Sequence, residues 1–248
     1  LGEQFEPGVG HLGGQGQRGG LVVGATGRHA EGFGVGLGAH PVGLDVDRVQ
    51  QVLDSEVCQE QITMLRKELE GIRVVLSVER LDYTKGTYAK LLAFEALLEA
   101  HPELIGKVSL ITICVPAARE MTIYAELLGQ IEQAVGRING RFSRVGWTPV
   151  QFFYRAVPFD QLVAYYLMAD VMWITPLRDG LNLVAKEYVA TQGLCGGAGV
   201  LVLSEFAGAA AELHGALLTN PHDPHDLRDG LYIGLTLGRA EREARLRE

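Results

Sequence analysis

Short, continuously apolar runs alternate along this chain with segments long enough to form a helix, and this alternation restricts the fold more than any other feature. We expect six strands, at residues 73–78, 108–115, 150–157, 171–175, 200–203 and 216–219. Strands that are apolar throughout belong in a parallel sheet, because the connecting helices of such a sheet cover both of its faces. The sequence therefore predicts an α/β fold with a doubly wound, Rossmann-like parallel sheet.

Helical patterns fill the segments between these runs. A first helix begins at Asp45 or Asp47, either of which can cap it, and ends at Gly71. The further helices are expected at residues 88–100, 120–138, 159–168 and 181–191, with a short one at 207–213 and a helical tail from residue 225 onward.

The first 37 residues differ in composition from the rest of the chain, since 13 of them are glycine. Such a segment buries too little apolar surface to offset the entropy that is lost on ordering. We therefore expect residues 1–37 to be disordered or foreign to the fold, and residues 38–248 to form a ligand-binding α/β domain. A phosphate-binding Gly-rich loop is the alternative, but such a loop needs a strand before it and a helix after it.

Charge and cysteine content exclude several classes of protein. A formal net charge of -8 argues against a nucleic-acid surface, which normally carries a basic excess. No apolar run reaches the roughly 20 residues that a membrane span requires. The three cysteines lack metal-ligand or disulfide-framework spacing, which indicates a reducing, cytoplasmic location. Because the chain starts at Leu1 and lacks the features of a secretory signal, we expect a fragment of a cytoplasmic protein.

A turn and a helix start follow the apolar strand at 171–175, in the sequence RDGLNLVAKE at residues 178–187. Ligands of open parallel sheets bind at the carboxyl ends of the strands, and the free N–H groups of a helix start suit a phosphate. Asp179 and Glu187 bracket this helix start. Helical rise sets their backbones about 12 Å apart, about the span from a sugar to a ribose across a diphosphate.

These two carboxylates predict a nucleotide-sugar site. In that site Asp179 accepts hydrogen bonds from sugar hydroxyls, and Glu187 accepts them from the ribose. The alternative is that Asp179 only caps the helix and that Glu187 faces solvent beside Lys186.

Two cations, Arg80 and Lys85, follow the strand at 73–78 on one turn. Beside a diphosphate they would stabilise the negative charge that develops on a leaving nucleotide. The alternative is that Arg80 pairs with Asp82 and that Lys85 is solvated.

Other arginines are weaker candidates for a binding site. Arg119 follows another strand end and could reach an anionic acceptor, although its spacing alone favours a structural role such as pairing with Glu120. A basic cluster of Arg137, Arg141 and Arg144 fits a solvated loop better than a site.

Several motifs, taken together and in order, resemble the trehalose-phosphate synthase superfamily of retaining glycosyltransferases. They are SVERLDYTKG at 77–86, VGRING at 135–140, GWTP at 146–149, and the segments 175–187 and 199–212. The resemblance covers the chain from about residue 38 to its end. Three further stretches are most similar to the glucosylglycerol-phosphate synthase branch, namely ICVPAAREMTIY at 113–124, DVMW at 170–173 and LLTNPHDP at 217–224.

The resemblance implies a role for each matching residue. Arg80 and Lys85 would hold the donor diphosphate, and Asp179 would contact the transferred glucose, so that these three form the catalytic group. Substrate binding would involve the acceptor-phosphate arginine, the helix start and the ribose carboxylate, which are Arg119, Gly180, Asn182, Leu183 and Glu187.

The resemblance also implies a fold and a reaction. The fold would be the C-terminal, donor-binding domain of a GT-B glycosyltransferase, with the acceptor-binding domain absent upstream, so that this fragment alone binds donor without catalysis. The reaction would move glucose from ADP-glucose to sn-glycerol 3-phosphate with retention of configuration, and would need no cofactor and no metal. The alternatives are a trehalose-6-phosphate synthase, which uses glucose 6-phosphate as acceptor, and a non-catalytic nucleotide-sugar-binding domain.

Overall fold

The computed structural model describes residues 20–25, 37–117 and 122–248. The chain divides into two compact units, Leu1–Gly43 and Leu44–Glu248. In the first unit, β1 (Gly20–Ala25) pairs antiparallel with β2 (Leu37–Val42). The expected boundary at residue 38 therefore falls inside β2. The expectation for most of residues 1–37 lies outside the described residues and stays a prediction.

The second unit is built on a six-stranded parallel sheet, which confirms the predicted doubly wound α/β fold. Its strand order is β5-β4-β3-β6-β7-β8. The strands are β3 (Arg73–Arg80), β4 (Val108–Val115), β5 (Val150–Tyr154), β6 (Val171–Ile174), β7 (Val200–Ser204) and β8 (Leu217–Thr219). From β3 the chain builds outward to β5, and it then returns to β6 and builds the other way. The switch point of this sheet therefore lies between β3 and β6.

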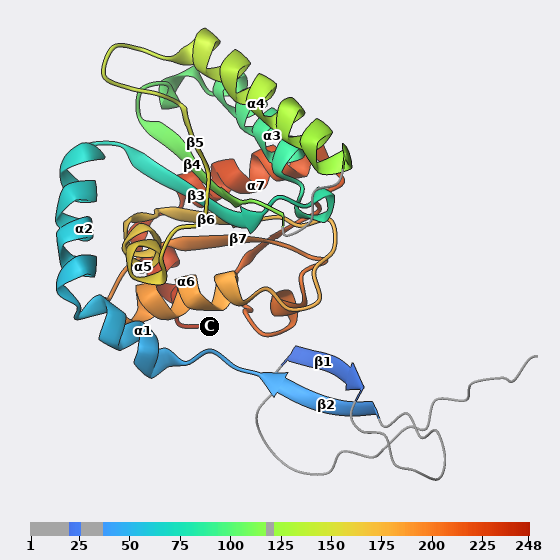
Figure 1. Cartoon of the computed structure of the whole chain (residues 1–248). Helices are drawn as coiled ribbons and strands as arrows, with labels where there is room; N and C mark the ends of the chain where they lie inside the picture. The colour runs from blue at the N-terminus through green and yellow to red at the C-terminus, as the bar shows by residue number, and fades with distance from the viewer. Residues whose placement is uncertain (1–19, 26–36, 118–121) are drawn as a thin grey trace, which may run out of the picture. The chain divides into compact units, whose positions relative to one another are not determined.

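Helices cover both faces of the sheet (Figure 1). One face carries α1 (Val46–Leu53), α2 (Glu56–Glu68), α5 (Phe159–Met168) and α6 (Leu183–Leu194). The other face carries α3 (Thr87–Ala100), α4 (Thr122–Phe142) and α7 (Pro224–Thr236). The chain also forms α8 (Arg239–Leu246) and three 3-10 turns, which are η1 (Tyr83–Lys85), η2 (Pro102–Leu104) and η3 (Gly208–Ala211).

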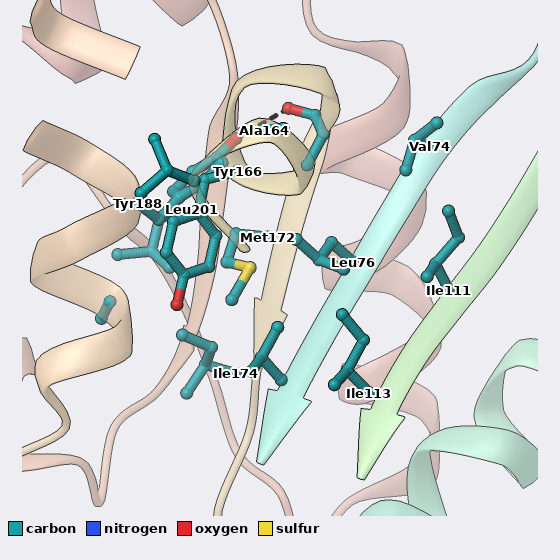
Figure 2. Close-up of a cluster of buried hydrophobic side chains, with 14 of the residues drawn as sticks. Val74, Leu76, Ile111, Ile113, Ala164, Tyr166, Met172, Ile174, Tyr188 and Leu201 are labelled. Carbon is teal, nitrogen blue, oxygen red and sulfur yellow. Dashed lines mark hydrogen bonds between the residues drawn. The ribbon is translucent and has the colours of Figure 1, made fainter. Parts of the chain in front are cut away.

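The two hydrophobic cores follow from the alternation of side chains along each strand. In β3, Val74 and Leu76 belong to the core under α5 and α6, whereas Val75 between them belongs to the core under α3 and α7. Figure 2 shows the first of these cores, in which side chains from neighbouring strands pack together and against two helices. The labelled residues are Val74, Leu76, Ile111, Ile113, Ala164, Tyr166, Met172, Ile174, Tyr188 and Leu201.

Two expected elements differ from the observed ones. The prediction of a single helix from Asp45 or Asp47 to Gly71 is wrong, because α1 ends before Asp54 and a separate helix, α2, begins at Glu56. At this break the Ser55 hydroxyl accepts a hydrogen bond from the Cys58 N–H at 3.3 Å and so caps the second helix. The expected short helix at 207–213 is only the 3-10 turn η3. None of the described helices is long and apolar enough to cross a membrane.

We predict that the sheet core sets the stability of the second unit. Leu76 is 0% exposed, so Leu76→Ala should lower the free energy of unfolding by about 3 kcal/mol, through lost transfer energy and a residual cavity. The matched control is Leu218→Ala in β8, where the leucine is 53% exposed and the loss should stay below about 1 kcal/mol. Urea denaturation of both variants measures the difference, and equal losses would contradict the assigned core.

Candidate active site

The loops that follow β3 and β6 meet at the switch point of the sheet. The N–H of Leu177, after β6, donates to the carbonyl oxygen of Thr84, after β3, at 2.7 Å. Gly86 has a φ of 70°, and a Cβ atom there would lie 3.0 Å from the Thr175 carbonyl oxygen. A glycine is therefore required both by the left-handed backbone and by the close approach of the two loops.

The β3 loop is shaped by Asp82, which does not pair with Arg80. Its carboxylate accepts hydrogen bonds from the Thr84 N–H at 2.9 Å and from the Thr84 hydroxyl at 2.8 Å. Arg80 is the last residue of β3, is exposed, and has no ion-pair partner within the part of the chain that the structure describes. The interpretation of Arg80 as the partner of Asp82 is therefore wrong.

An ion pair joins the two loops across the switch point. Lys85 Nζ lies 2.7 Å from Asp179 Oδ2, and the two side chains are only 16% and 14% exposed. The alternative in which Lys85 is solvated is therefore wrong. Two of the predicted catalytic residues, which are 94 positions apart in sequence, are thus brought into direct contact.

Asp179 has further partners in its own loop. Its carboxylate accepts from the Leu181 N–H at 3.3 Å and from the Asn182 side-chain amide at 3.1 Å. Burial by itself raises the pKa of Asp179, but the hydrogen bond and charge of Lys85, with the two loop donors, outweigh it and lower the pKa. Asp179 therefore stays ionised and holds the loop closed.

Asn182, and not Asp179, caps the helix that follows. The backbone of Asn182 is left-handed, with a φ of 67°, and its side chain accepts from the Ala185 N–H at 3.0 Å. Helix α6 accordingly begins at Leu183, so the interpretation of Asp179 as the helix cap is wrong. Only residues 183–187 of the interval from Asp179 to Glu187 are helical. Helical rise therefore accounts for about 6 Å along the helix axis, and not for the expected 12 Å.

A third loop, after β7, fixes the backbone of Asp179. The Asp179 N–H donates to the Phe206 carbonyl oxygen at 3.2 Å, and the Gly208 N–H donates to the Asp179 carbonyl oxygen at 2.8 Å. A Cβ atom on Gly208 would lie 2.1 Å from the Gly180 carbonyl oxygen. The sequence analysis assigned no role to this loop, because the pairing of loops is not visible in sequence spacing.

Glu187 faces helix α5 and not the solvent. One of its carboxylate oxygens accepts from the hydroxyl of Tyr166 at 2.8 Å, while its neighbour Lys186 pairs with Glu212 at 2.8 Å. The alternative in which Glu187 simply faces solvent beside Lys186 is therefore wrong. Burial raises the pKa of Glu187, and the Tyr166 hydrogen bond together with the charge of Arg48 opposes that rise.

Sequence reasoning missed a buried polar cluster beside these residues. Glu79, the neighbour of Arg80, lies with Lys90 in a buried ion pair, and Ser77 and Thr87 complete the cluster. The signal was a serine and a glutamate inside an otherwise apolar strand. Arg119, the predicted acceptor-phosphate residue, lies outside the described residues.

Two cavities of the described structure lie elsewhere. One is lined by residues of α6, β7 and α8 and by the segment between β7 and β8, most of them apolar, among them Tyr188 and Leu213. The other is lined by Arg73 and Asp170, which stand at the amino ends of β3 and β6.

The sequence profile of glycosyltransferase family 20 matches residues 21–248. This chain belongs to glycosyltransferase family 20. The match confirms the resemblance to the trehalose-phosphate synthase superfamily, and it begins within the Gly-rich segment that was expected to be foreign to the fold.

Curated relatives show the same relationship. The chain is 68% identical to a glucosylglycerol-phosphate synthase of Pseudomonas anguilliseptica over 86% of this chain and 28% of the relative. It is 42% identical to a UDP-forming α,α-trehalose-phosphate synthase of Schizosaccharomyces pombe over 85% of this chain and 40% of the relative.

Solved structures agree with the fold. The α,α-trehalose 6-phosphate synthase of Burkholderia multivorans matches with a TM-score of 0.79 at 44% identity, over 86% of this chain and 45% of that one. An E. coli structure described as trehalose-6-phosphate bound with UDP-2-fluoro glucose matches with a TM-score of 0.79 at 37% identity, over 91% of this chain and 51% of that one. The expected GT-B domain is confirmed, and the chain spans about half or less of each of these relatives.

We predict that the contact between Gly208 and Gly180 tolerates a methyl group on one side only. A Cβ on Gly208 would collide with backbone, whereas a Cβ on Gly180 meets nothing within 4 Å. Gly208→Ala should therefore lower the free energy of unfolding by about 1–3 kcal/mol through backbone displacement. Gly180→Ala is the matched control, with a change within about 0.5 kcal/mol. Thermal denaturation measures both, and the reverse order would contradict the loop geometry.

The lowered pKa of Asp179 predicts an acid-sensitive contribution to stability. A carboxylate with a depressed native pKa contributes stability that is complete above the unfolded pKa, about 3.9, and is lost as pH falls through the native value. The difference in unfolding free energy between wild type and Asp179→Asn should thus be constant above about pH 5 and shrink below about pH 4. Urea titrations at several pH values test this, and a difference that grows in acid would contradict it.

Proposed function

We propose that this chain is the donor-binding part of a retaining glucosyltransferase, which transfers glucose from ADP-glucose to sn-glycerol 3-phosphate and forms glucosylglycerol phosphate. The Lys85–Asp179 contact at the switch point supports the proposal, because a cation and a carboxylate lie together at the sheet edge where such folds bind ligands. The 68% identity to a glucosylglycerol-phosphate synthase supports the choice of product.

In this proposal the bound donor replaces the contact between Lys85 and Asp179 with contacts of its own to both residues. The diphosphate takes over Lys85, and glucose hydroxyls donate to the carboxylate of Asp179 in place of the ammonium group. Arg80, which no described residue neutralises, adds a second cation at the end of β3. Both cations then stabilise the charge that develops on the departing ADP as the glycosidic bond to it breaks.

The helix start and the ribose carboxylate complete the donor site. Gly180, Asn182 and Leu183 precede or open helix α6, whose positive end favours the diphosphate. Glu187 uses one oxygen for Tyr166, and its other oxygen has no hydrogen-bond donor among the described residues. We assign that second oxygen to the ribose hydroxyls of the donor.

The proposed acceptor rests on the similarity of this chain to its relatives. We propose that Arg119 binds the phosphate of the acceptor, as the motif resemblance implies. A trehalose-6-phosphate synthase is the second candidate, supported by the 42% identity to the Schizosaccharomyces pombe enzyme and by a Burkholderia xenovorans structure in complex with glucose-6-phosphate. A cytoplasmic location is part of the proposal, since the three cysteines are free thiols and two of them are buried.

Calorimetric titration of the chain with ADP-glucose, UDP-glucose and ADP tests donor binding. Saturable binding of ADP-glucose is expected, and absence of binding by all three ligands to folded protein would refute the proposal. An acceptor screen on a protein that also carries the family's upstream domain separates the two enzymes. Consumption of glucose 6-phosphate without consumption of glycerol 3-phosphate would decide for trehalose-phosphate synthesis, and transfer to neither would favour a non-catalytic binding domain.

We predict that Lys85→Ala weakens ADP-glucose binding by about 10- to 100-fold, because a charge-assisted contact to the diphosphate is lost and Asp179 is left facing the anion. The matched control is Lys107→Ala, an exposed lysine just before β4 at the amino-terminal edge of the sheet, which should change affinity less than twofold. Isothermal calorimetry measures both dissociation constants. Equal affinities for the two variants would remove Lys85 from the site.

A further inference from the structure

A buried ion pair stands at the base of the loop that carries Arg80 and Lys85. Glu79 and Lys90 form it, with side chains only 7% and 2% exposed. Lys90 Nζ also donates to the hydroxyl of Ser77 at 2.6 Å. Glu79 is the residue before Arg80 in β3, and Lys90 lies in the first turns of α3.

The second oxygen of Glu79 is also occupied. It accepts a hydrogen bond from the hydroxyl of Thr87, which is the first residue of α3 and is 2% exposed. Glu79 and Thr87 directly precede and follow the loop at residues 80–86. Their hydrogen bond therefore closes the two ends of the loop on each other.

This closure restricts where the two cations can lie. The far side of the loop is fixed to the β6 loop by the bond from Leu177 to Thr84 and by the tight approach of Gly86 to Thr175. With both its ends and its far side held, the loop has little freedom to change the separation of Arg80 from Lys85.

Stability alone does not account for the charged pair. A buried ion pair gains little over well-packed apolar side chains, because desolvation of the two charges offsets their attraction. The ion pair also saturates Glu79, so that this carboxylate does not neutralise Arg80, its neighbour on the opposite face of the strand.

We propose that Glu79, Thr87 and Lys90 are positioning residues, which set the geometry of the two diphosphate-binding cations without touching the donor. This inference rests on the proposed function, because it concerns the same site. It requires that loss of the Glu79–Thr87 bond weakens recognition of the β-phosphate specifically.

Thr87→Val and Thr87→Ser form the test pair. Valine keeps the shape of threonine but removes the hydroxyl, whereas serine keeps the hydroxyl. Calorimetry with ADP-glucose, ADP and AMP reports each dissociation constant, and AMP lacks the β-phosphate. Thr87→Val should weaken ADP-glucose and ADP by about tenfold and AMP by less than twofold, while Thr87→Ser stays within twofold of wild type for all three.

The outcomes separate this inference from the proposed function. Failure of the wild-type chain to bind ADP-glucose would overturn both. Binding by wild type together with unchanged affinities in Thr87→Val would overturn the positioning role alone, and so would an equal loss for AMP and ADP, which is the mark of general destabilisation. If Thr87→Val does not fold, Glu79→Gln replaces it, because the amide leaves one donor unpaired and should give the same selective loss.

Discussion

The ion pair between Lys85 and Asp179 is the contact on which the rest of the site depends. It joins the loop after β3 to the loop after β6, at the point where the chain changes the direction in which it builds the sheet. The helices that follow these two loops, α3 and α6, pack on opposite faces. Together with the hydrogen bond from Leu177 to Thr84, this pair of charges joins the loops of the two halves of the sheet at the edge where a ligand is expected to bind.

Local anion recognition is compatible with the acidic character of this chain. The formal net charge is -8, whereas the two cations Arg80 and Lys85 lie within one short segment of the chain. The two cations differ in their ion pairing, since Lys85 is neutralised by Asp179 and Arg80 has no such partner among the described residues. In the proposed site, a diphosphate would compete with the Asp179 carboxylate for Lys85, whereas no described residue competes for Arg80.

Much of the fold could be predicted from sequence, because a strand buried on both faces must be apolar throughout, as in Val108–Val115, which was predicted to the residue. The break between α1 and α2 was missed, since the hydrophobic pattern continues through Asp54 and Ser55. The candidate site residues were chosen from motifs and strand ends, and their roles stay predictions. The contacts between these residues could not be predicted. Lys85 contacts Asp179 because β3 and β6 are neighbours in the sheet, and Glu79 contacts Thr87 because the intervening loop brings its two ends together.

The close packing of Gly208 against the Gly180 carbonyl has a consequence for how this enzyme family can diversify. Nothing larger than a hydrogen atom fits on Gly208 without a shift of the backbone, so the turns after β6 and β7 are in direct contact at this point. A Cβ atom on Gly180, in contrast, would have no other atom within 4 Å. A larger residue is therefore sterically permitted at position 180 and excluded at position 208, although the two residues touch.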